Sequence, residues 1–254
     1  MTSLGSAPVL MTLLDHLSHS GDLLFRWRSY FPLLLLPVFL LALADSPFAA
    51  APEGWGRVWQ VFCLLLSLAG LAVRVLTIGT APAGTSERST TDPRAAALNT
   101  TGAYSIVRHP LYLGNTLVAL GLACLPGVWY LPVIVVLASL LYHERIAARE
   151  ERFLEERFGD DFRRWADRVP AAVPALARYV PPATPFWWRR VLGREFHALF
   201  VIGAGFFVLD VARRFLLTGL ITPDPFWTSV LAVTGAIFIV LIVIKKSTGW
   251  LKWG

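Results

Sequence analysis

Apolar runs long enough to cross a bilayer recur along the chain, separated by short polar segments. A helix crosses the hydrocarbon core in about 20 residues. A window of that size finds candidate spans at 29–45, 57–78, 110–125, 127–142, 196–217 and 226–244. Only Leu125, Pro126 and Gly127 separate the third and fourth candidates, so we expect a tight helical hairpin that tilts or does not fully span. The pattern predicts an all-α polytopic membrane protein with about six transmembrane helices.

After the fourth candidate span, apolar and charged residues alternate in a different pattern. Between 143 and 168, apolar residues recur at spacings near three, four and seven with charges between them, namely Ile146, Phe153, Phe158, Phe162 and Trp165. This spacing is typical of an amphipathic helix, here interrupted around Gly159. We expect it to continue the fourth membrane helix into the cytosol and to turn back along the bilayer. The Pro-rich connector that follows ends in Trp187, Trp188, Arg189 and Arg190, which suits the lipid headgroup layer.

Composition agrees with a membrane location. The chain of 254 residues is 56% hydrophobic and 16% charged, with a mean hydropathy of +0.58, which is too apolar for an ordinary soluble domain. Lys and Arg in short loops are retained on the cytoplasmic side. A model with both termini in the cytosol leaves only Arg57, Arg213 and Arg214 outside, so we expect this orientation, in a bacterial inner membrane. The pI of about 9.7 then indicates attraction to anionic lipid, not to nucleic acid.

Residues 102–114, with the sequence GAYSIVRHPLYLG, place a polar cluster directly before the third apolar segment. Proline disfavours helix in the preceding residue, so His109 and Pro110 mark the start of a helix. The unpaired first-turn amides, the helix dipole and Arg108 then form a site for a carboxylate or phosphate. The alternative is that Arg108 and His109 anchor a helix end in headgroups while Tyr104 and Tyr112 form an interfacial belt.

A second charged cluster, Glu150 and Glu151, should emerge on the same side of the membrane as the first. Its alternative interpretation is a solvated helix face flanked by Arg149 and Arg152. The two cysteines and five histidines are scattered and lack metal-ligand spacing, so we expect no metal site.

The string Gly102-x-Tyr104-x-x-Val107-Arg108-His109-Pro110-x-Tyr112-x-Gly114, followed by Arg145, Glu150-Glu151, Leu154 and Phe158-Gly159, resembles the membrane methyltransferases of the isoprenylcysteine carboxyl methyltransferase and phospholipid methyltransferase superfamily. The resemblance covers about 57–168, with Phe162 in place of the family's usual Tyr. It implies an enzyme that uses S-adenosylmethionine. The cofactor-binding residues it implies are Ala96, Leu98, Asn99, Tyr104, His109, Pro110, Leu111, Tyr112, Gly114, Glu150 and Glu151.

Methyl transfer from a sulfonium needs mainly positioning and electrostatics. A carboxylate or phosphate acceptor is already anionic and needs an arginine to orient it, for which we name Arg108 and Arg145 as catalytic residues. An amine acceptor would need a base, and His143 or Glu144 is the nearest candidate. The abundance of arginine favours an oxygen acceptor on a lipid or another membrane-embedded molecule.

Two further charges lie within apolar segments. Arg74 either has a structural role or reaches the cofactor carboxylate or the acceptor headgroup. Asp210 has Arg213 and Arg214 at the spacings of an intrahelical ion pair.

The expected organisation is an N-terminal segment with the first helix (1–56), a methyltransferase-like core (57–168), an interfacial connector (169–195) and two C-terminal membrane helices (196–254). Two alternatives remain at this stage: a nicotinamide-dependent reductase of the sterol reductase type, and a non-enzymatic lipid-binding protein. Pro110 after His109, Asn115 after Gly114 and the short chain favour methyl transfer over reduction.

Overall fold

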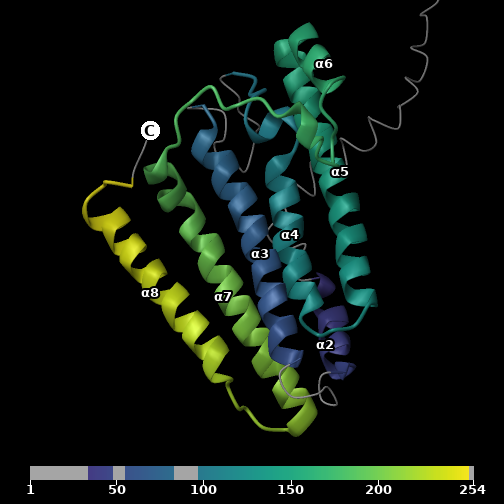
Figure 1. Cartoon of the computed structure of the whole chain (residues 1–254), viewed down its shortest axis with the longest axis vertical. Coiled ribbons are helices and arrows are strands. Elements are labelled where there is room, and N and C mark those ends of the chain that lie inside the picture. Colours follow the sequence, from purple (N-terminus) through teal and green to yellow (C-terminus); the bar gives the residue numbers. More distant parts are fainter. Residues whose placement is uncertain (1–33, 48–54, 83–96, 252–254) are drawn as a thin grey trace, which may run out of the picture.

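The computed structural model describes residues 34–47, 55–82 and 97–251 and is built from helices arranged side by side in an elongated bundle (Figure 1). The helices are α2 (Leu36–Ala44), α3 (Trp55–Thr80), α4 (Pro110–Cys124), α5 (Tyr130–Phe158), α6 (Asp160–Ala166), α7 (Trp188–Thr218) and α8 (Pro225–Ser247), with 3₁₀ turns η3 (Ala103–Ser105) and η4 (Leu176–Arg178). Within the described ranges the only β contact is an isolated bridge between Gly102 and Val180. The all-α prediction is confirmed.

Four of the described helices, α3, α5, α7 and α8, are long and apolar enough to cross a membrane. The expected hairpin is present as α4 and α5, but its two arms differ. Helix α4 has 15 residues and so reaches only about 22 Å at 1.5 Å per residue. Helix α5 has 29 residues because it continues through the charged segment as one helix. The described part of the first candidate, α2, has nine residues, and 29–33 lie outside the described ranges.

Helix α7 begins at Trp188, so the prediction that this helix starts near 196 is wrong. The hydropathy window misses its first turns because Arg190 and Glu195 lower the local average. Both side chains are buried in the bundle, where each has a partner. Arg190 donates to the carbonyl oxygens of Ile78 and Ala81, which lie at the C-terminal end of α3 and need such a donor.

Helices α3 and α4 run antiparallel and pack backbone to backbone. A Cβ atom built on Gly70 would lie 2.5 Å from the carbonyl oxygen of Gly114, and one built on Gly121 would lie 2.5 Å from the carbonyl oxygen of Cys63. Ser67 adds a hydrogen bond of 2.9 Å from its hydroxyl to the carbonyl of Val118. In lipid, such close contact between small residues is what drives helix association.

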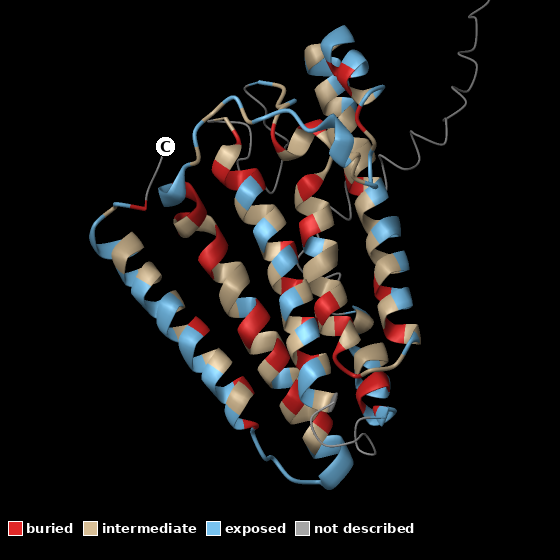
Figure 2. Cartoon of the chain, viewed as in Figure 1, coloured by how far each residue is buried: buried red, intermediate tan, exposed pale blue. Residues whose placement is uncertain are grey.

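Two apolar clusters complete the bundle. Phe206 on α7 stacks on Trp227 of α8 with ring centroids 4.8 Å apart, and this pair packs with Cys63, Leu125 and Ile202 of the neighbouring helices. A second cluster joins α2, α4 and α5 through Ala42, Ala123, Leu131 and Val135. Buried residues follow the inward sides of these helices, whereas α8 is largely exposed at the edge (Figure 2).

The expected ion pair on α7 is confirmed and forms part of a larger network. Asp210, fully buried, accepts from Arg213 and Arg214 at 2.8 Å each. Arg214 and Arg57 both pair with Asp224, at 2.6 and 2.8 Å, so the start of α3, the end of α7 and the cap of α8 are joined. The three arginines expected on one side of the membrane therefore share one end of the bundle.

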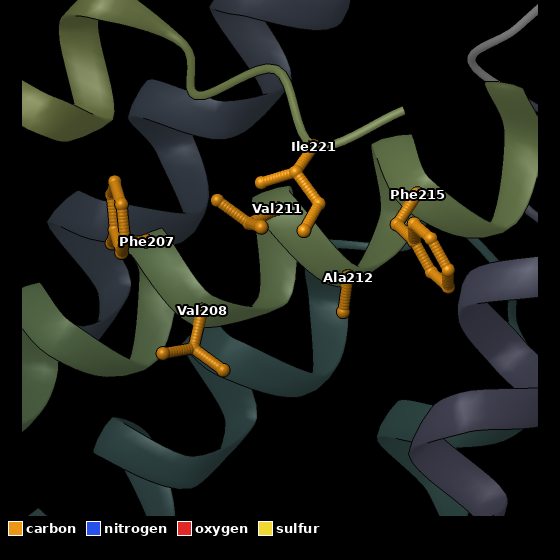
Figure 3. Close-up of a pocket in the computed structure, with 6 residues that line it drawn as sticks. All are labelled: Phe207, Val208, Val211, Ala212, Phe215 and Ile221. Carbon is orange, nitrogen blue, oxygen red and sulfur yellow. The ribbon is translucent and has the colours of Figure 1, made fainter. Parts of the chain in front are cut away.

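Beside this network, α7 carries an apolar hollow of about 310 Å³. It is lined by Phe207, Val208, Val211, Ala212, Phe215 and Ile221, all with hydrocarbon side chains (Figure 3). Without a polar group, the hollow offers no chemistry of its own.

At the opposite end, α5 breaks at Gly159, whose φ of 51° lies in the region that glycine alone adopts readily. Helix α6 follows, and α5 and α6 project beyond the other helices (Figure 1). Phe162 and Trp165 of α6 are buried against Leu98 and Tyr104. The prediction of an amphipathic helix interrupted at Gly159 is confirmed.

Candidate functional site

The two motifs predicted from the sequence meet where α4 begins. The hydroxyl of Tyr112 donates to Glu150 Oε1 at 2.6 Å. His109 Nε2 lies 2.8 Å from Glu151 Oε1, and Arg108 donates to Glu151 Oε2 at 3.1 Å. Glu150 and Glu151 of α5 are therefore both bonded to residues at the start of α4. The two carboxylates are not separate solvated charges but one site with the helix start.

Three rings form a ladder across the same junction. His109 stacks on Tyr112 with centroids 5.4 Å apart, and Tyr112 stacks on His143 of α5 at 4.7 Å with an interplanar angle of 9°. His143 Nδ1 also lies 3.3 Å from the hydroxyl of Thr116. This ladder holds Tyr112 in the rotamer from which its hydroxyl reaches Glu150.

The site carries both charge signs and remains accessible. Side-chain exposure is 31% for Glu150 and 24% for Glu151, and 21% for Arg108. The α4 N-terminus adds the positive end of its dipole because Pro110 begins the helix. One end of a ligand can therefore find carboxylate oxygens while another finds cationic N–H donors.

The connector, which sequence reasoning assigned to the headgroup layer, packs along the motif. The amide of Arg108 donates to the carbonyl of Pro170, and the amide of Gly102 to that of Val180, both at 2.9 Å. Ser105, buried, accepts from the amide of Val180 at 2.9 Å and donates to the carbonyl of Gly102 at 2.7 Å. Gly102 has φ +60° and so needs to be glycine. No periodic pattern in the connector could have revealed these backbone contacts.

Helix α6 covers the preceding loop. The indole of Trp165 donates to the carbonyl of Tyr104 at 3.1 Å, and Leu98 packs in the same cluster. Asn99 Oδ1 accepts from the amide of Thr101. Leu98 and Tyr104 thus pack in one cluster with α6, Asn99 bonds within its own loop, and Ala96 lies outside the described residues.

The remaining predicted residues are placed differently. Pro110 is buried in the first turn of α4, and Leu111 beside it is half-buried. Gly114 does not face Glu150; it packs against Gly70 and Arg74 of α3. Arg145 donates to the carbonyl of Leu141 on its own helix.

Arg74 lies within the bundle. It pairs with Glu195 of α7 and donates to Asn115 of α4. Neither Glu195 nor Asn115 was among the predicted site residues. Asn115 stood out only as a polar residue within an apolar segment, whereas Glu195 fell in the expected connector, next to Arg194. Among the described residues, no group of three or more His, Cys, Asp or Glu side chains is arranged to hold a metal ion.

Comparison with known proteins identifies the region that holds this site. Residues 59–161 match the model of the phospholipid methyltransferase family. This span contains α3 from its second turn, α4, α5 and the first two residues of α6. No solved structure matches the chain.

Curated relatives each match part of this chain. The cobalt-zinc-cadmium resistance protein CzcN of Cupriavidus metallidurans is 34% identical over 49% of this chain and 56% of its own length. The nickel-cobalt-cadmium resistance protein NccN of Alcaligenes xylosoxydans xylosoxydans is 31% identical over 51% of this chain and 59% of its own. The protein-S-isoprenylcysteine O-methyltransferase of Schizosaccharomyces pombe is 32% identical over 31% of this chain and 34% of its own.

The chain thus spans a little over half the length of the first two relatives. The family match includes both motifs that meet at α4 and α5, and the yeast relative carries the second family name that those motifs suggested. These matches support a relationship between residues 59–161 and the superfamily of integral membrane proteins that includes the phospholipid methyltransferases and the isoprenylcysteine methyltransferases.

Proposed function

We propose that this protein is an S-adenosylmethionine-dependent methyltransferase whose acceptor is a lipid or another membrane-embedded molecule. One observation carries the proposal. The Arg108–Tyr112 segment and the Glu150–Glu151 pair form one hydrogen-bonded site, within the region that matches the phospholipid methyltransferase family.

The residues of the site suit the proposed cofactor. S-adenosylmethionine carries a cationic sulfonium and amine together with an anionic carboxylate, so its site must offer both signs. Glu150 and Glu151 supply acceptor oxygens for the amine or the ribose hydroxyls, a charge-assisted contact. Arg108, His109 and the first-turn amides of α4 suit the carboxylate. The adenosine would lie under the loop from Ala96 to Asn99 and against Tyr104, with Pro110, Leu111 and Tyr112 along the helix start.

The cofactor, when bound, supplies an electrophilic methyl group on its sulfonium. The chain's own residues bind, orient and shield the reactants, because in-line displacement on a methyl group needs little proton transfer. We propose an oxygen acceptor, either carboxylate or phosphate, with Arg108 and Arg145 as the residues that orient it. For Arg145 this requires its side chain to leave the carbonyl of Leu141. His143 stays the candidate base should the acceptor be an amine.

We also propose that the site lies at the cytosolic face of a bacterial inner membrane, with both termini on that side. The asymmetry of arginines supports this orientation, since among the described residues Arg57, Arg213 and Arg214 gather at the far end. We also propose the division into an N-terminal segment (1–56), a core (57–168), a connector (169–195) and two C-terminal helices (196–254). However, the connector contacts the motif and α7 begins within the expected connector range.

Calorimetric titration of the purified protein with S-adenosylmethionine tests the proposal. Glu150→Gln keeps the shape of the side chain but removes its charge, so the dissociation constant should rise about ten-fold or more. Glu156→Gln, on an exposed position of the same helix, is the matched control and should bind as wild type does. Tritiated cofactor incubated with a bacterial lipid extract then reports transfer. A folded protein that shows no saturable binding would refute the proposal.

A further inference from the structure

Arg74 carries a charge inside a membrane helix, and three of its five N–H groups bond to neighbouring side chains. Its Nε donates to Glu195 Oε2 at 2.7 Å and its Nη2 to Glu195 Oε1 at 2.8 Å, a bidentate pair. Side-chain exposure is 13% for Arg74 and 3% for Glu195. An ionisable residue within a membrane segment is costly, and it marks a functional group more often than not.

The pair with Glu195 leaves Nη1 of Arg74 directed toward α4. The Nη1 of Arg74 donates to Asn115 Oδ1, and the arginine side chain passes directly over Gly114. A Cβ atom at Gly114 would lie 2.6 Å from Cγ of Arg74. Gly114 is the last glycine of the sequence motif, and in this structure its missing side chain is what lets Arg74 reach Asn115.

Asn115 is exposed, although it lies on an apolar helix and directly follows the buried Gly114. Because its Oδ1 accepts from Arg74, the amide is oriented with its two N–H donors directed away from the arginine. Tyr112 precedes it by three residues, a spacing at which helical side chains are neighbours about 5–6 Å apart. The oriented amide therefore stands next to the proposed methyl-transfer site and on the outer surface of the bundle.

We infer that Asn115, oriented by the Arg74–Glu195 pair, binds the anionic oxygen group of the acceptor, a membrane amphiphile that carries a carboxylate or phosphate. This inference rests on the proposed function and specifies its acceptor site. The cluster offers N–H donors from both Asn115 and Arg74, which suits an anionic oxygen. Asn115 is exposed and lies three residues after Tyr112, so it can bind the acceptor beside Arg108 and Arg145, the residues proposed above to orient it.

A purely structural role explains the cluster less well. Buried ion pairs contribute little net stability compared with apolar packing of the same volume. Helix association between α3 and α4 is already provided by the Gly70–Gly114 contact and by Ser67. Structural pairing also gives no reason for an exposed amide in an apolar helix.

Binding of amphiphilic probes to the full chain in lipid nanodiscs tests the inference. The anionic probes are N-acetyl-S-farnesylcysteine, a carboxylate, and dodecyl phosphate. Their neutral counterparts are the farnesylcysteine carboxamide and dodecanol. The variants are Asn115→Leu, which removes the donors, and Asn115→Asp, which replaces them with a negative charge. Ser67→Ala is the matched control because it removes an α3–α4 hydrogen bond outside the cluster.

Wild type should prefer at least one anionic probe to its neutral counterpart, and the probe preferred identifies carboxylate or phosphate as the group. Asn115→Leu should weaken binding of that anionic probe about ten-fold, and Asn115→Asp should weaken it more strongly. Neither variant should change binding of the neutral probes, and Ser67→Ala should bind every probe as wild type does. Equal binding of anionic and neutral probes by wild type, or anionic binding that survives Asn115→Leu, would overturn the inference. S-adenosylmethionine titrated into the same samples separates the two proposals, since failure of cofactor binding in wild type refutes the proposed function alone.

Discussion

The hydroxyl of Tyr112 on α4 and the carboxylate of Glu150 on α5 are joined by a hydrogen bond of 2.6 Å. The residues are 38 positions apart and belong to the two arms of the helical hairpin. A phenol that donates to a carboxylate makes a charge-assisted bond, which is stronger than a neutral one. This bond fixes the position of Glu150 relative to the start of α4.

Replacing Tyr112 with Phe distinguishes the contribution of the hydroxyl from that of the ring. The Tyr112→Phe variant should keep the ladder with His109 and His143 but lose the constraint on Glu150. We expect S-adenosylmethionine to bind about ten-fold more weakly, with little change in thermal stability, since one hydrogen bond to a charged group is lost. Calorimetry and thermal unfolding measure the two effects. Tyr179→Phe, at an exposed position, is the control, and equal binding by Tyr112→Phe and wild type would contradict the prediction.

The contact between α3 and α4 predicts that the stability lost on replacing a glycine with alanine depends on how closely that glycine is packed. Gly114→Ala would place a Cβ atom 2.8 Å from the backbone oxygen of Gly70 as well as against Arg74, so the helices must move apart. We expect a loss of about 1–3 kcal/mol, as for other overpacked interiors. Gly235→Ala meets only an ordinary contact of 3.8 Å with Phe200 and should be neutral. Thermal unfolding in detergent compares them, and similar melting temperatures would show that the close contact is not required.

The connector should depend on Ser105, whose hydroxyl bonds to both Val180 and Gly102. Ser105→Ala removes both hydrogen bonds of this buried hydroxyl, which should cost about 1 kcal/mol because the exposed Val180 amide can bond to water instead. We expect faster tryptic cleavage after Arg178 and weaker cofactor binding. Ser229→Ala removes an exposed hydrogen bond within α8 and serves as the control. Unchanged cleavage in Ser105→Ala would mean that the connector is held by its other contacts.

The pKa of Asp224 predicts that the end of the bundle that it holds together is destabilised at acid pH. Burial raises the pKa of its carboxyl, but hydrogen bonds from Arg57 and the amide of Phe226, together with the charge of Arg214, outweigh burial and leave the pKa below its ordinary value of 3.8. A carboxyl with a lowered folded-state pKa stabilises the fold above its ordinary pKa, and this contribution is lost as the pH falls through the folded value.

The Asp224→Asn variant should therefore be less stable than wild type at neutral pH, by about 1–3 kcal/mol. The difference should shrink below about pH 4, where wild type loses the same charge. Chemical unfolding at neutral and acid pH measures this, with the exposed Asp160→Asn as control. A constant difference between Asp224→Asn and wild type at both pH values would contradict the assignment.

Much of the site was predictable because its residues are adjacent in sequence or follow a helical repeat. His109 and Pro110 mark the start of α4 by local backbone chemistry. Glu150 and Glu151 lie on a helix whose register follows from the hairpin. Arg74, Asn115 and Glu195 could not be grouped in this way, because they come from three helices and no spacing along the chain relates them.

The sequence by itself determined the membrane character, the helices and the two motifs, because hydropathy, proline placement and amphipathic spacing act locally along the chain. Only the tertiary structure decided which charges meet. Glu195 pairs with Arg74, Asp224 joins two helices through Arg57 and Arg214, and the connector bonds to the motif through its backbone. These pairings depend on helix rotation and offset. Packing between helices sets both, and one-dimensional periodicity carries no record of them.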